Sequence, residues 1–238
     1  DRLIAKQTAL IDTLRERRTA AIHALTFSLP RVDFRPVKQV ADVFIGKMLQ
    51  PEQRSAEEVY APYLRAAHVQ PLGRLIDVDD KRMWFGVEEL AAHDVRVGDV
   101  IVVEGGAGFG RSAVVREDLL GWGFQKSVIR IRAKPEHAVG AFIDYALQAA
   151  LAIGTVEMAA STATIPHFTA EKVAVFPIPS PAVEEQRKIV EQLDEQTAKI
   201  DLLISKAERF VELARERRAA LITAAVTGQI EVGERGAA

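Results

Sequence analysis

The sequence contains no cysteine among its 238 residues. This absence excludes disulfide frameworks, cysteine-ligated zinc and thiol catalysis, and it fits a reducing compartment, so we expect a cytoplasmic protein. Long apolar runs are also missing, since none approaches the roughly 18 residues that a membrane-spanning helix requires. The charged amino terminus lacks the pattern of a signal peptide. We therefore expect no membrane anchor.

A large excess of charge of one sign is absent as well. The chain carries 31 basic and 33 acidic residues, which gives a formal net charge of −2. This balance excludes a protein that is basic throughout, but it does not exclude one that contacts DNA with part of its surface. With 48% hydrophobic and 27% charged residues, the chain can bury a core, which excludes the disordered and fibrous classes.

Recognisable catalytic and metal-binding motifs are missing. The five histidines show no helical spacing of three or four residues, so the sequence predicts no metal site. Residues 105–112 (Gly-Gly-Ala-Gly-Phe-Gly-Arg-Ser) approach a phosphate-binding P-loop, but Arg111 stands where that loop requires lysine. Residues 113–116 continue as a predicted strand and do not open a helix, so no helix dipole faces an anion there. We expect a glycine-rich turn and no catalytic residue.

A repeat links the two ends of the chain. Shifting the sequence by 200 residues places residues 15–18 on residues 215–218, and both segments read Arg-Glu-Arg-Arg. Over residues 1–26 the identical positions are Asp1, Leu3, Ile4, Lys6, Arg15, Glu16, Arg17, Arg18, Ala20, Ile22 and Ala24. Helical periodicity explains the shared apolar positions, but it does not explain a charged string in register. We therefore expect two equivalent helices, and a longer parent protein with a further domain before the first helix.

Both copies have the periodicity of long helices with a heptad seam. The second follows Pro181, carries Glu184 and Glu185 in its first turn, and reaches a capping glycine at Gly228. The sequence predicts that the two helices pack on each other. The residues expected in the seam are Leu10, Leu14, Leu203 and Phe210.

The segment between the helices predicts a globular α+β domain. Short β-branched runs separated by turns predict strands, 138–153 predicts a helix, and 171–178 predicts a final strand. Because the strict alternation of a Rossmann fold is absent, we expect a mixed or mostly antiparallel sheet. The predicted boundaries are 1–27 for the first helix, 28–182 for the domain, 183–228 for the second helix and 229–238 for a tail.

Basic side chains concentrate between residues 108 and 134, where the only acidic residues are Glu117 and Asp118. This local excess suits contact with a phosphate backbone, and it equally suits a solvated sheet face. Strand alternation places Arg130 and Arg132 on the same face. The candidates for DNA contact are Arg111, Lys126, Arg130, Arg132 and Lys134, followed by Lys81, Arg82, Arg74 and His167.

Several segments resemble the specificity subunit of type I restriction-modification systems. One runs from Thr164-Ile-Pro-His-Phe through Pro177-Ile-Pro-Ser-Pro into Glu184-Glu-Gln-Arg, and another covers 213–230. Within the domain, Tyr63-Leu-Arg-Ala-Ala-His-Val-Gln and Gly98-Asp-Val-Ile-Val-Val-Glu-Gly-Gly resemble the target recognition domain of that family. The resemblance extends over nearly the whole chain.

The resemblance implies a target recognition domain flanked by two long helices that form an antiparallel coiled coil. It implies a non-catalytic subunit that reads one half of a bipartite site in double-stranded DNA and docks the methylation subunits. Those subunits are expected to bind S-adenosylmethionine, so this chain needs no cofactor of its own. A restriction and motor subunit would join through the complex. The resemblance also allows a homodimer through the helices, because half-length members of the family act as dimers.

Two other functions fit the residues themselves. The heptad seam and the balanced charge suit a coiled-coil scaffold or dimerisation protein whose central domain binds another protein. An enzyme that binds phosphate through residues 105–112 is a third alternative. The family resemblance favours the DNA-reading subunit over both.

Overall fold

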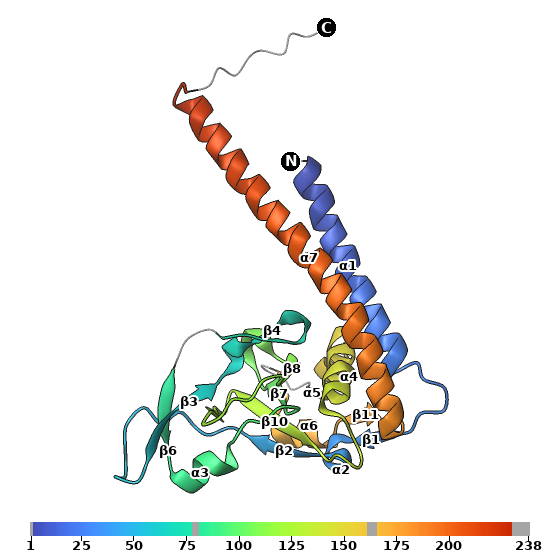
Figure 1. Cartoon of the computed structure of the whole chain (residues 1–238), viewed down its shortest axis with the longest axis vertical. Coiled ribbons are helices and arrows are strands. Elements are labelled where there is room, and N and C mark those ends of the chain that lie inside the picture. The colour runs from blue at the N-terminus through green and yellow to red at the C-terminus, as the bar shows by residue number, and fades with distance from the viewer. Residues whose placement is uncertain (1, 78–80, 161–165, 230–238) are drawn as a thin grey trace. The chain divides into compact units, whose positions relative to one another are not determined.

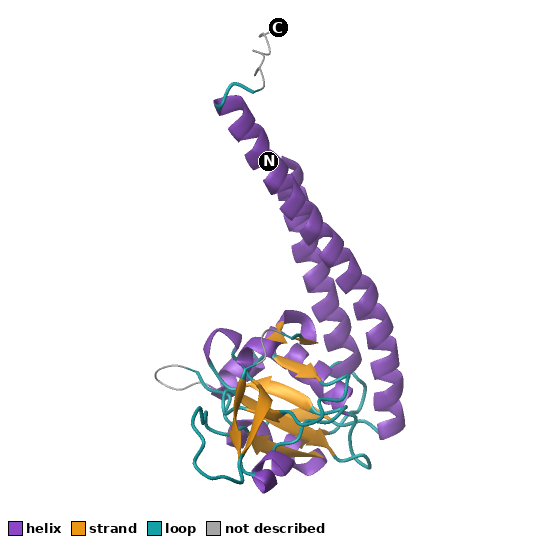
Figure 2. Cartoon of the chain, turned by 60° about the vertical axis from the view of Figure 1, so that its left-hand side comes forward, coloured by secondary structure: helices purple, strands orange, loops and turns teal. Residues whose placement is uncertain are grey.

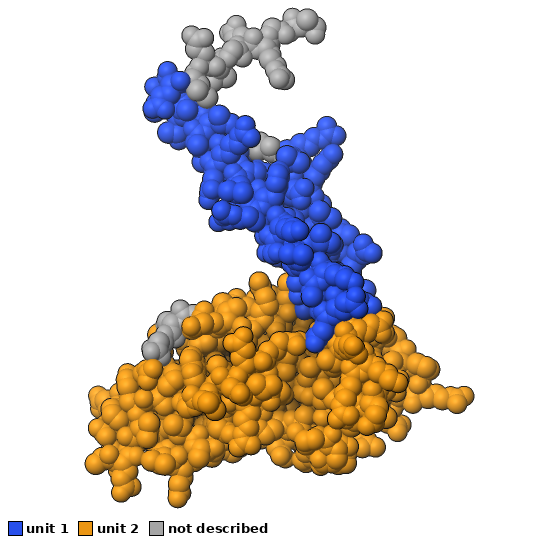
Figure 3. All heavy atoms as spheres, viewed as in Figure 1, with its two compact units in different colours: residues 1–20, 194–238 blue, residues 21–193 orange. Residues whose placement is uncertain are grey.

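The structure is a computed structural model that describes residues 2–77, 81–160 and 166–229. The chain divides into two compact units, coloured separately in Figure 3. Unit 1 comprises residues 1–20 and 194–238, and unit 2 comprises residues 21–193. Helices α1 (Arg2–Thr26) and α7 (Val183–Val226) each belong partly to both units, so the two units are described one after the other.

A four-stranded antiparallel sheet forms the centre of unit 2 (Figure 1). Its strand order is β2-β10-β7-β8, and the strands are β2 (Ala41–Ile45), β10 (Val128–Ala133), β7 (Val100–Val103) and β8 (Ser112–Val114). All four residues of β7 are buried. This means that both faces of the sheet are covered, unlike a sheet that shows one face to water.

Shorter strands extend the domain around this sheet. Strand β3 (Val59–Leu64) lies between β6 (Arg82–Phe85), which is antiparallel to it, and β9 (Gly123–Phe124), which is parallel. The remaining strands form two antiparallel pairs, β1 (Phe34–Pro36) with β11 (Pro177–Pro179) and β4 (Val69–Gln70) with β5 (Arg74–Leu75).

Helices of very different length accompany the strands (Figure 2). The α-helices of unit 2 are α2 (Val37–Val40), α3 (Val87–Ala92), α4 (Gly140–Ala152), α5 (Thr155–Ala160) and α6 (Ala170–Val175). The 3-10 turns are η1 (Ala66–His68), η2 (Pro71–Gly73) and η3 (Gly106–Gly108). The mixed sheets and the two long flanking helices confirm the predicted α+β fold.

The central sheet separates two hydrophobic cores. On one face, Val100, Val102 and Ile129 pack with residues of α4 such as Ile143 and Leu147. On the other face, Ile101, Val103 and Val128 pack with Leu64 and Phe124. Alternate residues of β7 and β10 therefore enter different cores, as the pleat of a strand requires.

Helix α4 packs against the parts of both long helices that belong to unit 2. Phe142 and Tyr145 of α4 form a third core with Ile22 of α1 and with Ile189 and Leu193 of α7. A hydrogen bond adds to this core: the side chain of Gln186 accepts from the backbone N–H of Val139 at 2.9 Å. These contacts attach residues 21–26 and 183–193 of the two helices to α4 within unit 2.

The predicted strand at 171–178 is wrong over most of its length. Residues 170–175 form α6, and only Pro177–Pro179 form a strand, β11. Glu171 lies in the first turn of α6, where a carboxylate is favourable, and Val173 is fully buried in the first core. Because both β1 and β11 contain proline, this pair suits the edge of the structure rather than its centre.

Unit 1 contains two antiparallel helical segments. Arg15 of α1 contacts Glu208 of α7 at 2.8 Å, and Arg18 contacts Asp201 at 2.9 Å. As the residue number rises in one helix it falls in the other, so the helices run in opposite directions. Gly228 has a φ of +71° and closes α7, with the N–H of Gln229 bonded to the carbonyl of Ala224 at 2.8 Å, which confirms the predicted cap.

The predicted seam is correct at Leu14 and wrong at Leu10, Leu203 and Phe210. Leu14 is buried, whereas the other three side chains are exposed. The buried row lies one position further along each helix, and it contains Ile11, Ile204, Ala207 and Val211. Both rows are apolar, so the sequence pattern alone does not decide between them.

Candidate functional site

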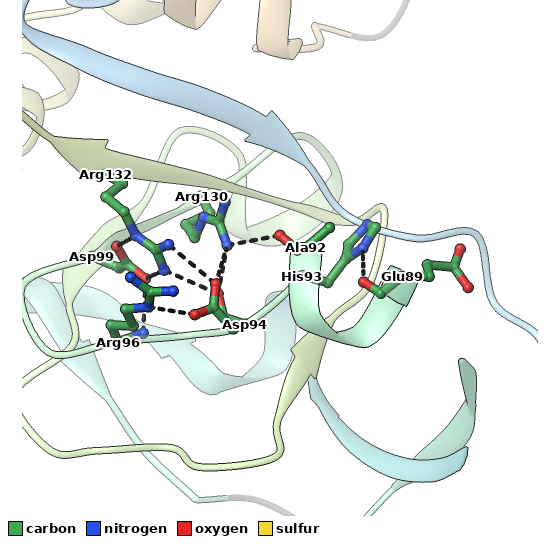
Figure 4. Close-up of polar contacts among 8 residues, drawn as sticks. All are labelled: Glu89, Ala92, His93, Asp94, Arg96, Asp99, Arg130 and Arg132. Atoms are coloured by element: carbon green, nitrogen blue, oxygen red, sulfur yellow. Dashed lines mark hydrogen bonds and ion pairs between the residues drawn. The ribbon is translucent and has the colours of Figure 1, made fainter. Parts of the chain in front are cut away.

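A cluster of charged side chains surrounds β10, the strand that carries two of the predicted DNA contacts, Arg130 and Arg132 (Figure 4). Arg130 is 7% exposed, and its Nη1 donates to the carbonyls of Ala92 and Asp94 at 3.1 and 2.5 Å. Its guanidinium carbon lies 5.4 Å from the ring centre of Phe44 and 5.3 Å from that of Phe124. Arg130 is thus held inside the domain, which corrects the expectation that it contacts DNA.

Arg132 lies beside Arg130 and is bound by two carboxylates. It donates to both carboxylate oxygens of Asp99 at 2.8 and 2.7 Å, and to Asp94 at 3.1 Å. The hydrogen bonds that Arg132 donates to Asp99 raise the pKa of Arg132. Burial alone would raise the pKa of Asp94, but hydrogen bonds from Arg96 and Arg132 hold it below its ordinary value. These hydrogen bonds hold β10 to the segment 94–99.

Lys134 continues the series at the end of β10. Its Nζ lies 3.5 Å from a carboxylate oxygen of Asp42 and 3.4 Å from the carbonyl of Lys38. The basic run in the sequence therefore divides into one buried residue, Arg130, and two that pair with carboxylates of the same domain. The predictions of DNA contact for Arg132 and Lys134 are not tested by this geometry.

Three other predicted residues gather around the glycine-rich turn between β7 and β8. Arg111 follows the turn, and a Cβ on Gly105 would lie 2.8 Å from the His167 ring. The N–H of Glu104 bonds to the carbonyl of Ser127, next to Lys126, at 3.1 Å. Lys126 and His167 are exposed, and Arg111 is partly exposed. Predicted residues that are up to about 55 positions apart in sequence thus lie on segments next to this turn.

The glycine-rich turn does not have the geometry of a P-loop. It closes an antiparallel hairpin, in which the N–H of Gly110 bonds to the carbonyl of Val103 at 3.0 Å. Apart from the single 3-10 turn η3, the segment leads directly into strand β8, so no α-helix follows it as in a P-loop. This agrees with the expectation of a structural turn.

The remaining candidates lie on two other segments. Arg82 is exposed on β6, opposite Pro62 of β3, and Lys81 precedes it and is also exposed. Arg74 is exposed on β5 and lines a hollow that also contains His68, Arg116 and Trp122. Sequence reasoning missed this hollow, because its walls come from segments that no spacing pattern connects.

The residues that line the groove between the two helices of unit 1 follow the 200-residue repeat of the sequence. It has a volume of about 400 Å³. Its lining residues are Thr8, Ile11, Asp12 and Arg15 together with Glu208, Val211, Glu212, Arg215 and Glu216. Except for Glu216, every lining residue of one helix has its repeat equivalent, 200 positions away in the sequence, in the lining of the same groove. The repeated helices therefore pack about a local pseudo-twofold axis near Ile11 and Val211.

The described parts of the chain contain neither a metal-binding cluster nor a membrane-spanning helix. No group of three or more histidine, aspartate or glutamate side chains there could hold a metal ion. In the same residues, no helix has the length and apolar character needed to cross a membrane.

The fold therefore defines an α+β domain carried on a pair of long, repeat-related helices. The model of the family described as "Type I restriction modification DNA specificity domain" matches residues 31–209. The chain belongs to this family, which confirms the resemblance seen in its sequence.

Solved structures show the same fold. A crystal structure of the HsdS subunit from Thermoanaerobacter tengcongensis is 17% identical with a TM-score of 0.52, over 89% of this chain and 55% of that chain. A structure described for complex assembly and conformational transition of the type I R-M system is 19% identical with a TM-score of 0.59, over 94% and 57%.

The S subunit of the type I system from M. genitalium is 17% identical with a TM-score of 0.56, over 91% of this chain and 56% of that one. The chain thus spans little more than half the length of these structural relatives. No curated protein sequence matches it.

Proposed function

We propose that this chain is a non-catalytic subunit that reads one half of a bipartite DNA sequence within a type I restriction-modification complex. The observation that carries the proposal is the family match, which covers the domain and most of α7. Recognition of DNA sequence follows from the family, and the assignment of half a site follows from the single α+β domain in this chain.

The surface of unit 2 supports this proposal. Exposed basic side chains, which can neutralise phosphates, lie at the glycine-rich turn (Lys126), on β6 (Arg82) and on β5 (Arg74). They come from separate segments, as is required if several of them are to follow a DNA backbone. The net charge of −2 is compatible with such a surface, because affinity depends on the local field rather than on the total charge.

The helices of unit 1 are proposed to dock the methylation subunits. Each helix buries one apolar row against the other and leaves a second row exposed, which includes Leu3 and Leu10 on α1 and Leu203, Phe210 and Leu213 on α7. An exposed apolar row on a long helix is typical of a binding surface. The methylation subunits would bind S-adenosylmethionine, and a restriction and motor subunit would join the assembled complex.

The proposal is tested by enrichment of randomised DNA duplexes with the chain assembled with its methylation subunits. We expect one half-site sequence to be enriched. Lys126→Ala should weaken binding to all sequences and reduce the slope of log affinity against log salt by about one unit. Glu157→Ala, a change at an exposed acidic residue of α5, is the matched control. If no sequence is enriched by the assembled complex, the proposal is wrong and a scaffold function replaces it.

A further inference from the structure

Unit 2 contains a hollow of about 570 Å³ beside strands β5 and β8. Leu64, Leu75, Val114 and Leu119 contribute aliphatic walls, and Trp122 contributes an indole ring. The Trp122 ring meets the ring of buried His68 edge-on, with centroids 6.0 Å apart. The volume lies in the range of sites that accept a small organic group, and the walls suit a flat aromatic one.

Charged side chains lie at the same hollow. Arg74 and Arg116 are exposed and line it, as do the carboxylates of Asp77 and Glu117. Arginine binds phosphate with a planar fork of donors, and carboxylates accept hydrogen bonds from the exocyclic amino groups of bases. The hollow therefore combines an apolar interior with groups that suit a nucleotide.

A tight turn next to the hollow presents a leucine to solvent. Leu120 is 88% exposed, which is the largest value for any large hydrophobic side chain in the described ranges. The N–H of Trp122 bonds to the carbonyl of Leu119 at 3.1 Å, and Gly121 adopts a φ of +75° that favours glycine. Leu119 and Trp122 pack on the second core. The turn is thus anchored at both sides, and Leu120 is held away from the protein.

The charges beside Leu120 indicate what the turn can contact. Glu117 and Asp118 are exposed immediately before it, and they would repel a phosphate backbone. They do not oppose contact with base edges, where a carboxylate pairs with the amino group of cytosine. The turn is therefore suited to the bases rather than to the backbone.

We propose that Leu120 is a wedge that enters the base stack of the target DNA, and that the hollow lined by Trp122 receives the base that it displaces. This inference rests on the proposed function and adds to it a mechanism by which the chain recognises its DNA sequence. Apolar side chains that enter a base step unstack it and bend the duplex. A displaced base is held by stacking on aromatic or apolar side chains and by hydrogen bonds to its edge. Arg74 would contact the phosphate beside that base.

The test uses the complex of the full chain with its methylation subunits and the duplex that it enriches. A fluorescent base analogue, 2-aminopurine at purines and pyrrolocytosine at pyrimidines, replaces each base in turn. We expect a several-fold rise in fluorescence on binding at one position, because an analogue that leaves the base stack is no longer quenched by its neighbouring bases. Leu120→Ala and Trp122→Ala should return that position to the signal of free duplex.

Two variants serve as controls. Met158→Ala removes another exposed apolar side chain of unit 2, on α5, and should keep the signal. Trp122→Phe retains an aromatic wall and should also keep it, which separates loss of the wall from loss of the fold.

Binding strength provides a second measurement. Leu120→Ala should bind the intact duplex about tenfold more weakly than the unmodified chain, because the cost of unstacking is no longer offset by the wedge. On a duplex with an abasic site at the fluorescent position, the two should bind equally, since no base remains to be displaced.

The wedge is refuted if every position that becomes fluorescent stays so in Leu120→Ala, or if that variant binds the intact duplex as tightly as the unmodified chain. Either outcome leaves sequence enrichment, and hence the proposed function, in place. Failure of enrichment itself would refute the proposed function and the wedge together.

Discussion

Asp144 is a carboxylate that the domain buries on α4. It accepts hydrogen bonds from the Ser112 hydroxyl at 2.7 Å, from the backbone N–H of Val114 at 3.2 Å and from the Gln148 amide at 3.0 Å. These bonds connect α4 to β8. Burial nevertheless dominates, and it raises the pKa of Asp144 from 3.8 to about 6. The residue thus makes stability depend on pH.

Because the pKa of Asp144 is higher in the folded than in the unfolded chain, its stabilising contribution is present below about pH 4 and is lost as pH rises through about 6. The predicted loss is on the order of 3 kcal/mol, since one pKa unit corresponds to about 1.4 kcal/mol. Asp144→Asn should remove this part of the decline between pH 4 and 7. Urea unfolding at both pH values measures the free energy of unfolding. Asp118→Asn, which changes an exposed carboxylate, is the control. Parallel pH profiles for Asp144→Asn and the unmodified chain would contradict the prediction.

Arg130 shows why a basic side chain is hard to assign from sequence. Strand alternation correctly places it on one face with Arg132, and a half-exposed sheet would show that face to water. The strand instead lies in the middle of the sheet, and the segment 92–99 covers the face. Exposure is a property of the neighbouring segments, so the sequence of β10 alone cannot reveal it.

At the scale of elements, the helical seam gives the clearest division between what the sequence predicts and what it does not. Periodicity predicts two long helices, and the structure contains both. It does not predict their rotation, because Leu203 and Ile204 are neighbours and both are apolar. In the structure Ile204 is 2% exposed and Leu203 is 51% exposed. The first copy of the helix shows the same pattern, because Leu10 is exposed and Ile11 is buried.

This difference leads to a prediction for the helix pair. Ile204→Ala removes a buried side chain and should lower the free energy of unfolding of unit 1 by about 2–4 kcal/mol. Leu203→Ala removes an exposed side chain of similar size and should cost less than about 1 kcal/mol. Thermal unfolding followed by the helical circular dichroism signal compares the two. Equal losses would show that the seam is not the row that the structure buries.

At the scale of the whole molecule, the repeat of 200 residues acquires a structural meaning. Two copies of one helix lie antiparallel in unit 1 and line one groove with equivalent residues. Because both copies expose the same apolar row, a partner that docks on one can dock on the other in the same way.

The docking surface is tested by adding charge to the exposed row. Phe210→Asp should abolish assembly with the methylation subunits, because a buried unpaired carboxylate is costly at an interface. The helix pair should stay folded, since Phe210 does not belong to the buried row. Ser205→Asp adds the same charge on another face of α7 and should leave assembly intact. Size-exclusion chromatography of the mixed subunits provides the measurement, and assembly of the Phe210→Asp chain at normal strength would contradict the assignment.

The sequence by itself determined the class of fold, the repeated helices, the capping glycine and the family. Each of these depends on local patterns or on similarity along the chain. The tertiary structure decided which apolar row is buried, that Arg130 lies inside the domain, that residues 170–175 form a helix, and that Arg74 and Trp122 line one hollow. These features depend on contacts between segments far apart in sequence, where burial and charge pairing override local preference.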